Sequence, residues 1–318
     1  MNVKSLFKLV EIQTKVASIT PFFLGTLYAL YRFDSFRLKN FLLMLASLFC
    51  IDMATTAINN YLDFKRANRK YGYGYESHNA IVRYNLKESE VLITIFILLA
   101  SAVITGVFLF LNTNIVVLVL GAISFIVGIL YSFGPVPISR TPFGEVFSGI
   151  FMGLVIPFIA AYVHVYDQNI LNLVIQGGIL EIKANLPEIL YLILISLPAA
   201  AGIANIMLAN NICDIEDDME NKRYTLPVYI GKSISLKIYE MLYYTGYLAL
   251  IVLLIIGVAP IVSVLALATF IPVYRHIRIF RKEQSKKSTF VLAVKNFVVV
   301  NSVLSITIAV AVAFSHFS

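Results

Sequence analysis

Long runs without a charged residue dominate this sequence. Asp, Glu, Lys and Arg are absent from 91–139, 146–166, 189–213, 241–274 and 296–318. A helix needs about 20 apolar residues to cross the hydrocarbon core of a bilayer, so these runs predict membrane spans. Composition agrees, because only 14% of the residues are charged, against about 25% in an average soluble chain. A water-soluble enzyme, a secreted disulfide scaffold and a disordered chain are excluded.

Hydropathy over windows of about 19 residues predicts nine transmembrane helices. Their expected ranges are 16–32, 40–62, 91–111, 115–133, 145–166, 189–212, 240–257, 259–275 and 296–315. If the N-terminus is cytoplasmic, 21 of the 25 Lys and Arg residues fall in cytoplasmic segments, as the positive-inside rule predicts. We therefore expect an all-α integral membrane protein of the cell membrane, N-in and C-out, with its helices around a central cavity.

The second expected span ends in a polar cluster. Asp52, Asn59 and Asp63 fall within about 40° of one another on a helix, so they share one face. Asn60 lies beside them, and Lys65 and Arg66 follow. This cluster is expected at the cytoplasmic end of the span.

The sixth expected span ends in a similar cluster. Asn210, Asp214 and Asp218 step by four along one helix face, and Asn211, Lys222 and Arg223 accompany them. Asn59, Asn60 and Asp63 match Asn210, Asn211 and Asp214 at a constant offset of 151 residues. We expect one domain over 1–318 with repeat halves at about 1–140 and 141–318, and with the two acidic helix ends facing one cavity.

Two facing carboxylate clusters repel each other unless a cation lies between them. Mg²⁺ suits this place, because it takes oxygen ligands from one or two carboxylates, substrate phosphates and water. The residues predicted to hold it are Asn59, Asp63, Asn210, Asp214 and Asp218. Phosphate oxygens that the metal does not hold would be bound by the nearby Lys65, Arg66, Lys222 and Arg223. Asn60 and Asn211 are also predicted to contact substrate. Each cluster alone also fits a solvated helix boundary, but the shared Asn-Asn-x-x-Asp pattern favours a diphosphate site.

At these motifs the sequence resembles the UbiA-type superfamily of intramembrane aromatic prenyltransferases, over nearly the whole chain. The segment from Asn210 to Leu226, followed by Gly231, resembles the second motif of the 1,4-dihydroxy-2-naphthoate branch. So do the segment from Tyr131 to Pro137, Gly144-Glu145 beyond it, and Asn79-Ala-Ile-Val.

Three positions depart from the family pattern. Asn60 stands where the first motif commonly has Asp, and Ala67 where some members carry a further acid. Cys213 replaces a residue that is often basic in this branch. The departures in the first motif imply that its metal is held more loosely or through water, and Cys213 puts one phosphate contact of the family in question.

The resemblance implies an enzyme that transfers a polyprenyl group from its diphosphate to an aromatic acid. With 1,4-dihydroxy-2-naphthoate as the acceptor, the product loses carbon dioxide and is demethylmenaquinone. The resemblance also implies catalytic roles for Asp63, Asp214 and Asp218. Tyr131 would face the allylic cation or the diphosphate, or else anchor the end of its span at the membrane interface. Lys15 and Arg140 would contact phosphate or the acceptor carboxylate, or else follow only from the positive-inside rule.

Several alternatives remain at this stage. The acceptor can instead be 4-hydroxybenzoate or homogentisate, since only motif similarity separates them. A membrane transporter also uses half repeats and intramembrane acids, but prefers acids near the midplane, whereas all the clustered acids except Asp52 lie at one membrane face. The sequence contains no basic patch interleaved with aromatic residues, so it does not predict nucleic-acid binding.

Overall fold

The structure, a computed structural model, describes residues 1–66 and 79–315. Ala67 and the side chain of Arg66 lie outside this description.

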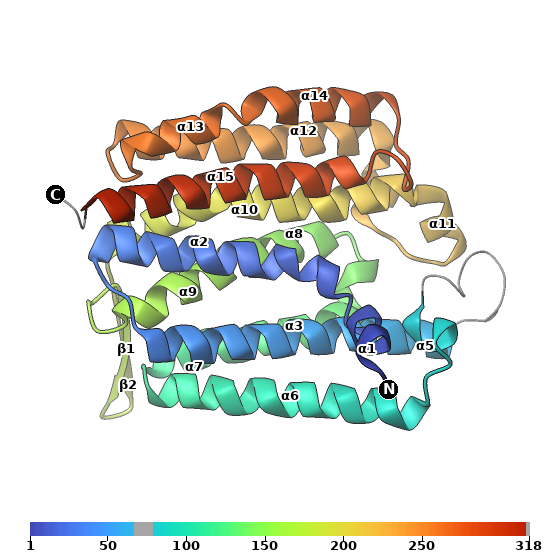
Figure 1. Cartoon of the computed structure of the whole chain (residues 1–318), viewed down its shortest axis with the longest axis horizontal. Helices are drawn as coiled ribbons and strands as arrows, with labels where there is room; N and C mark the ends of the chain where they lie inside the picture. Colours follow the sequence, from blue (N-terminus) through green and yellow to red (C-terminus); the bar gives the residue numbers. More distant parts are fainter. Residues whose placement is uncertain (67–78, 316–318) are drawn as a thin grey trace.

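The chain runs back and forth as a bundle of long, roughly parallel helices (Figure 1). In order, the elements are α1 (Val3–Leu9), η1 (Ile12–Lys15), α2 (Val16–Phe33), α3 (Leu38–Arg66), α5 (Ala80–Arg83), α6 (Glu88–Leu111), α7 (Ile115–Ser132), η2 (Ile138–Arg140), α8 (Gly144–Ile150), the π-helical η3 (Phe151–Val155), α9 (Ile156–Val165), β1 (Leu171–Gln176), β2 (Ile179–Ala184), α10 (Leu186–Cys213), α11 (Ile215–Glu220), α12 (Leu226–Ile255), η4 (Ile261–Ser263), α13 (Val264–Leu267), α14 (Phe270–Lys282) and α15 (Val291–Ser315).

Among the described residues, eight helical segments are long and apolar enough to cross a membrane. They match the expected spans apart from the first, since α2, which is 18 residues long and carries Arg32 near its end, is not among the eight. Large apolar side chains on the outer helices are exposed, for example Phe96 at 72% on α6. Such exposure is costly in water and normal toward lipid.

Two expectations about topology stay predictions. The helix α2 packs against α9 and α15, within the bundle, but its status as a ninth span is open. The two termini lie at opposite ends of the bundle (Figure 1), as an odd number of crossings requires. Which end faces the cytoplasm rests on the distribution of basic residues.

An antiparallel hairpin joins α9 to α10, between the expected spans 145–166 and 189–212. Strands β1 and β2 pair from Leu171↔Ala184 to Gln176↔Ile179. Gly177 and Gly178 form the turn with φ of 58° and 81°, the backbone that two-residue hairpins favour and that glycine adopts without strain. The helical fold class is confirmed, with this hairpin as an addition.

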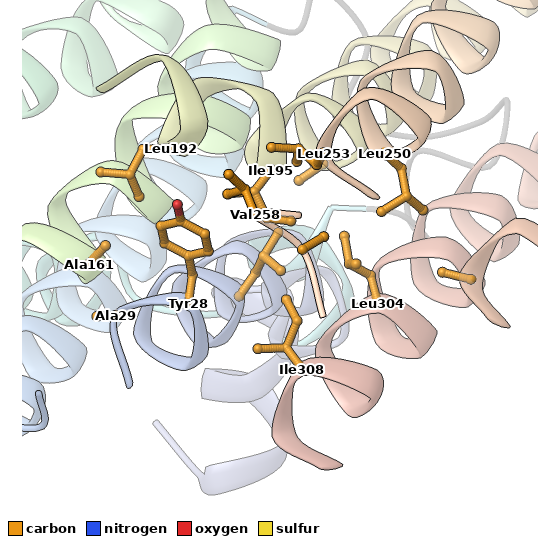
Figure 2. Packing of buried hydrophobic residues seen from close by; sticks show 14 of the residues in the cluster. Tyr28, Ala29, Ala161, Leu192, Ile195, Leu250, Leu253, Val258, Leu304 and Ile308 are labelled. Atoms are coloured by element: carbon orange, nitrogen blue, oxygen red, sulfur yellow. The ribbon is translucent and has the colours of Figure 1, made fainter. Parts of the chain in front are cut away.

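A large part of the core lies where α2, α10, α12 and α15 meet. Figure 2 shows Tyr28 of α2 beside Leu192 and Ile195 of α10, with Leu250 of α12 and Leu304 of α15 completing the cluster. Apolar contacts of this kind hold the two ends of the chain against its centre.

Small residues bring the helices beside this core very close together. A Cβ added at Gly153 in η3 would lie 2.2 Å from Ala200 Cα in α10, and one at Gly25 would lie 2.1 Å from Pro157 O in α9. Helices in membranes associate through such small residues. This close packing fixes the α8–η3–α9 segment against α10, which positions the aromatic residues of α8 and η3 beside the cavity described next.

The repeat halves also stay a prediction. The helices that carry the two motifs, α3 and α10, have similar lengths of 29 and 28 residues. Both run to the same end of the bundle (Figure 1).

Candidate active site

A cavity of about 910 Å³ opens between α2, α3, α6, α7, α8, η3 and α10. Apolar side chains of α6, α7 and η3 form much of its wall, for example Val103, Leu118 and Phe151. Polar side chains line it near the carboxyl ends of α3, α7 and α10 and in the loops beside them. These polar residues are Asn59, Asp63, Tyr131, Ser132, Ser139, Arg140, Asn210 and Arg223. The cavity thus has an apolar body and a polar end.

The first motif contributes one helix face to this cavity. Asp52, Asn59 and Asp63 all line it, as their helical spacing predicts. Asn60 is turned away, because its amide Nδ2 donates to the Leu9 carbonyl at 3.0 Å and only 7% of the residue is exposed. Lys65 does not line the cavity either and pairs with Glu88 at 2.6 Å.

The second motif divides in the same way. Asn210 lines the cavity, and its amide Nδ2 lies 3.4 Å from Asp214 Oδ2 one turn further on. Asn211 is fully buried behind it and donates to Glu145 Oε1 at 2.8 Å. In both motifs the first asparagine therefore faces the cavity and the second is used in packing.

Asp218 is the most buried acid of the second motif, at 3% exposure. It accepts a hydrogen bond from Thr225 Oγ1 at 3.0 Å and lies 3.3 Å from Arg223 Nε. Burial raises the pKa of the Asp218 carboxyl, and the Arg223 guanidinium and the Thr225 hydroxyl partly offset that rise. Neither Asp214 nor Asp218 lines the cavity, whereas Arg223 does. The ion pair with Asp218 therefore holds Arg223 at the cavity wall.

Two arginines bring positive charge to the polar end. Arg140 and Arg223 both line the cavity, and the Tyr224 backbone N–H donates to the Arg140 carbonyl at 3.1 Å. That bond ties the loop before α8 to the loop after α11. Lys222 is exposed and does not line the cavity.

Lys15 forms a buried ion pair beside the cavity. Its ammonium donates to Asp52 Oδ1 at 2.7 Å, to Thr56 Oγ1 at 2.6 Å and to the Asp52 carbonyl at 3.1 Å. Ser18 Oγ donates to the other oxygen of Asp52 at 2.5 Å. All three hydrogen atoms of the Lys15 ammonium are used in these bonds, and only 2% of the residue is exposed. Lys15 therefore ties the start of α2 to α3, and Asp52 rather than Lys15 lines the cavity.

We expect Lys15→Met to lower the free energy of unfolding by about 3 kcal/mol, because removing one partner of a buried pair leaves the other charge uncompensated. This value is at the low end of the range for breaking a buried ion pair, about 3–5 kcal/mol, since the Asp52 side chain is 16% exposed. Thermal unfolding in detergent measures it, with the exposed Lys4→Met as the control. Adding Asp52→Asn to Lys15→Met should restore part of the loss, and a double variant no more stable than Lys15→Met would contradict this origin.

The oxygen donors of the two motifs fit a hard divalent cation. Asn59 and Asp63 stand on α3, Asn210 stands on α10, and Asp214 is the cap residue between α10 and α11. A cation already rests on the second pair, since Lys286 Nζ lies 2.5 Å from Asn210 Oδ1 and also binds Asp214 Oδ2. Within residues 1–66 and 79–315, no three His, Cys, Asp or Glu residues group as a metal site. The carboxylate and amide oxygens of this set suit Mg²⁺, which commonly keeps water and phosphate ligands as well.

The sequence analysis missed two residues of this region. Lys286 comes from the turn before α15 and lies 72 positions from Asp214, so no local pattern indicates it. Glu145 was noted only as part of a motif, whereas the structure makes it the buried partner of Asn211.

A family model and a curated relative both identify this chain as similar to prenyltransferases. The model of the UbiA prenyltransferase family matches residues 18–312. A 1,4-dihydroxy-2-naphthoate octaprenyltransferase from Bacillus subtilis (strain 168) is 32% identical over 257 residues, which cover 80% of this chain and 75% of that protein.

Solved structures share the fold at low sequence identity. A UbiA homologue from Aeropyrum pernix K1 superposes with a TM-score of 0.66 at 18% identity, covering 94% of this chain and 98% of that one. A homologue from Archaeoglobus fulgidus, bound to DMAPP and Mg²⁺, gives 0.62 at 15% identity, covering 97% and 99%. A digeranylgeranylglyceryl phosphate synthase gives 0.65 at 17% identity, covering 98% and 99%.

These findings favour an enzyme over a transporter. The protein is a multi-pass membrane protein and a prenyltransferase, and its chain belongs to the UbiA prenyltransferase family.

Proposed function

We propose that the enzyme transfers a polyprenyl group from polyprenyl diphosphate to 1,4-dihydroxy-2-naphthoate, with loss of the carboxyl group, to give demethylmenaquinone. The observation that carries this proposal is the cavity, whose polar end joins Asn59 and Asp63 to Asn210, Arg140 and Arg223. An apolar body of this size beside a cationic and oxygen-rich end suits an isoprenoid diphosphate. The naphthoate acceptor is supported by the 32% identical relative.

In this reaction, the bond between the allylic carbon and the diphosphate oxygen breaks, and its electron pair leaves with the diphosphate. The developing negative charge lies where Arg140 and Arg223 line the cavity, and fixed cations there stabilise it. When bound, a divalent ion such as Mg²⁺ would neutralise further diphosphate charge. We propose Asn59, Asp63, Asn210 and Asp214 as its protein ligands, whereas Asp218 acts through Arg223.

The allylic cation then forms a carbon–carbon bond with the electron-rich ring. Tyr131 lines the cavity near its polar end, where an aromatic ring stabilises a cation that faces it. The apolar side chains of α6 and η3 that line the cavity exclude water, which would otherwise react with the cation. The acceptor carboxylate pairs with Arg140 or Arg223, because the ammonium of Lys15 is already bonded to Asp52 and Thr56.

We propose that this site faces the cytoplasm. The motif-bearing ends of α3 and α10 lie at the same end of the bundle as the short helix α11 (Figure 1). The segments at that end carry most of the Lys and Arg residues, which is the pattern of cytoplasmic loops. Both substrates would then enter from the cytoplasm or from the inner leaflet.

The test is an acceptor panel with the purified full chain in detergent. The protein, Mg²⁺ and a polyprenyl diphosphate are incubated in turn with 1,4-dihydroxy-2-naphthoate, 4-hydroxybenzoate and homogentisate, and the products are identified by mass. We expect a decarboxylated, prenylated product from the naphthoate and none after chelation of the metal. Turnover with 4-hydroxybenzoate alone would contradict the proposed acceptor and retain prenyl transfer.

A further inference from the structure

The turn between α14 and α15 places a lysine on the second motif. Lys286 Nζ lies 2.5 Å from Asn210 Oδ1 and pairs with Asp214 Oδ2. The same ammonium lies 5.6 Å from the centre of the Phe290 ring, and Phe290 lines the cavity. A residue remote in sequence from both motifs thus reaches the edge of the proposed diphosphate site.

The turn that carries Lys286 is closed by its own hydrogen bonds. The Ser285 backbone N–H donates to Thr289 Oγ1 at 2.8 Å, and the Phe290 N–H donates to the Ser285 carbonyl at 3.0 Å. Thr289 is only 5% exposed. The backbone is therefore anchored, and the flexible side chain of Lys286 is what can change partners.

The ion pair itself contributes little to folding. The side chains of Lys286 and Asp214 are 47% and 21% exposed, and pairs this accessible to water are weak because solvent screens them. This distinguishes Lys286 from Lys15, whose ammonium is buried with its carboxylate. The Lys286 ammonium can leave Asp214 without disrupting the core.

Lys286 and a divalent ion compete for the same two oxygens. Asn210 Oδ1 and Asp214 Oδ2 both contact the ammonium, and two cations cannot share them at contact distance without strong repulsion. A metal ion that binds there displaces the ammonium. The diphosphate of the substrate would then be the anion within its reach.

We propose that Lys286 is a diphosphate-binding residue that neutralises Asp214 until a metal ion replaces it. This inference rests on the proposed function, because it requires metal and diphosphate at the second motif. It makes Lys286 unfavourable for binding of the metal alone and favourable for binding of the metal together with diphosphate. The residue thereby couples occupation of the metal site to arrival of the substrate.

The test compares Lys286→Gln with Lys287→Gln in the full chain in detergent. Both variants remove one positive charge from the same turn, and Lys287 is an exposed neighbour. Binding of Mn²⁺ alone is measured by the loss of free-ion EPR signal. Binding of inorganic diphosphate at saturating Mg²⁺ is measured by calorimetry, and thermal unfolding checks that both variants are folded.

For Lys286→Gln, we expect Mn²⁺ to bind about threefold to tenfold more tightly, since its competitor is gone. Inorganic diphosphate should bind about tenfold more weakly, the usual effect of losing one charge-assisted hydrogen bond. Lys287→Gln should leave both constants within about twofold of the parent protein.

Two other results lead to different conclusions. If the dissociation constant for Mn²⁺ or for diphosphate is the same in Lys286→Gln as in Lys287→Gln, while the parent protein binds both probes, the proposed replacement of Lys286 by the metal ion is wrong. The proposed function then stands. If the parent protein binds neither Mn²⁺ nor diphosphate, the metal-diphosphate site itself is wrong and the inference fails with it.

Discussion

Replacing Asp63 or Asp214 by asparagine is expected to lower kcat/KM for prenyl transfer about a thousandfold. Each change keeps the size of the side chain and one oxygen ligand but removes a negative charge. Asp63 lines the cavity beside Asn59, and Asp214 lies one turn beyond Asn210. A carboxylate lost from either side weakens the hold on Mg²⁺ and leaves charge on the departing diphosphate uncompensated.

The matched control is Asp217→Asn, which changes an exposed acid of α11, three residues beyond Asp214. It should retain activity within about threefold, because exposed charges a few residues apart are screened. Single-turnover transfer at saturating Mg²⁺ measures all three variants, and thermal unfolding checks their fold. Near-parental rates for both Asp63→Asn and Asp214→Asn would remove these carboxylates from the proposed metal site.

Helical periodicity accounts for what the sequence predicted well. The stripe of Asp52, Asn59 and Asp63 lines the cavity, because residues seven and eleven apart return to one helix face. The same periodicity limits each Asn-Asn pair, since adjacent residues point about 100° apart. Only one member of each pair can face the cavity, and in both motifs it is the first.

The remaining features depend on contacts between distant segments. Asn60 bonds the Leu9 carbonyl, and Asn211 bonds Glu145. Lys286 reaches Asn210 from a turn 76 positions away. Period and spacing assign a residue to a face, but they do not say which loop or helix end lies opposite that face.

The hydropathy of the sequence does not predict the β1–β2 hairpin. The hairpin of β1 and β2 carries the Gly177-Gly178 turn, a two-residue turn that favours hairpins. A hydropathy reading of a membrane protein treats a connection between spans as a loop. Local turn chemistry indicates the hairpin, and the search for apolar runs does not detect it.

Release of labelled carbon dioxide from carboxyl-labelled 1,4-dihydroxy-2-naphthoate is expected to match prenylation mole for mole. The reason is the position of attack. If the new carbon–carbon bond forms at the ring carbon that bears the carboxyl group, that carbon has no hydrogen to lose. The carbon–carboxylate bond must break instead, and its electron pair returns to the ring and restores aromaticity as carbon dioxide leaves.

The comparison acceptor is carboxyl-labelled 4-hydroxybenzoate. Attack there occurs at a carbon that bears hydrogen, so a proton leaves and any product retains its label. The Asp63→Asn variant controls for spontaneous decarboxylation, because label released without prenyl transfer persists in that variant. The two reactions are distinguished by comparing the amount of released label with the amount of prenylated product, identified by mass. A prenylated naphthoate that keeps its label would exclude decarboxylating transfer and would leave the proposed diphosphate site unaffected.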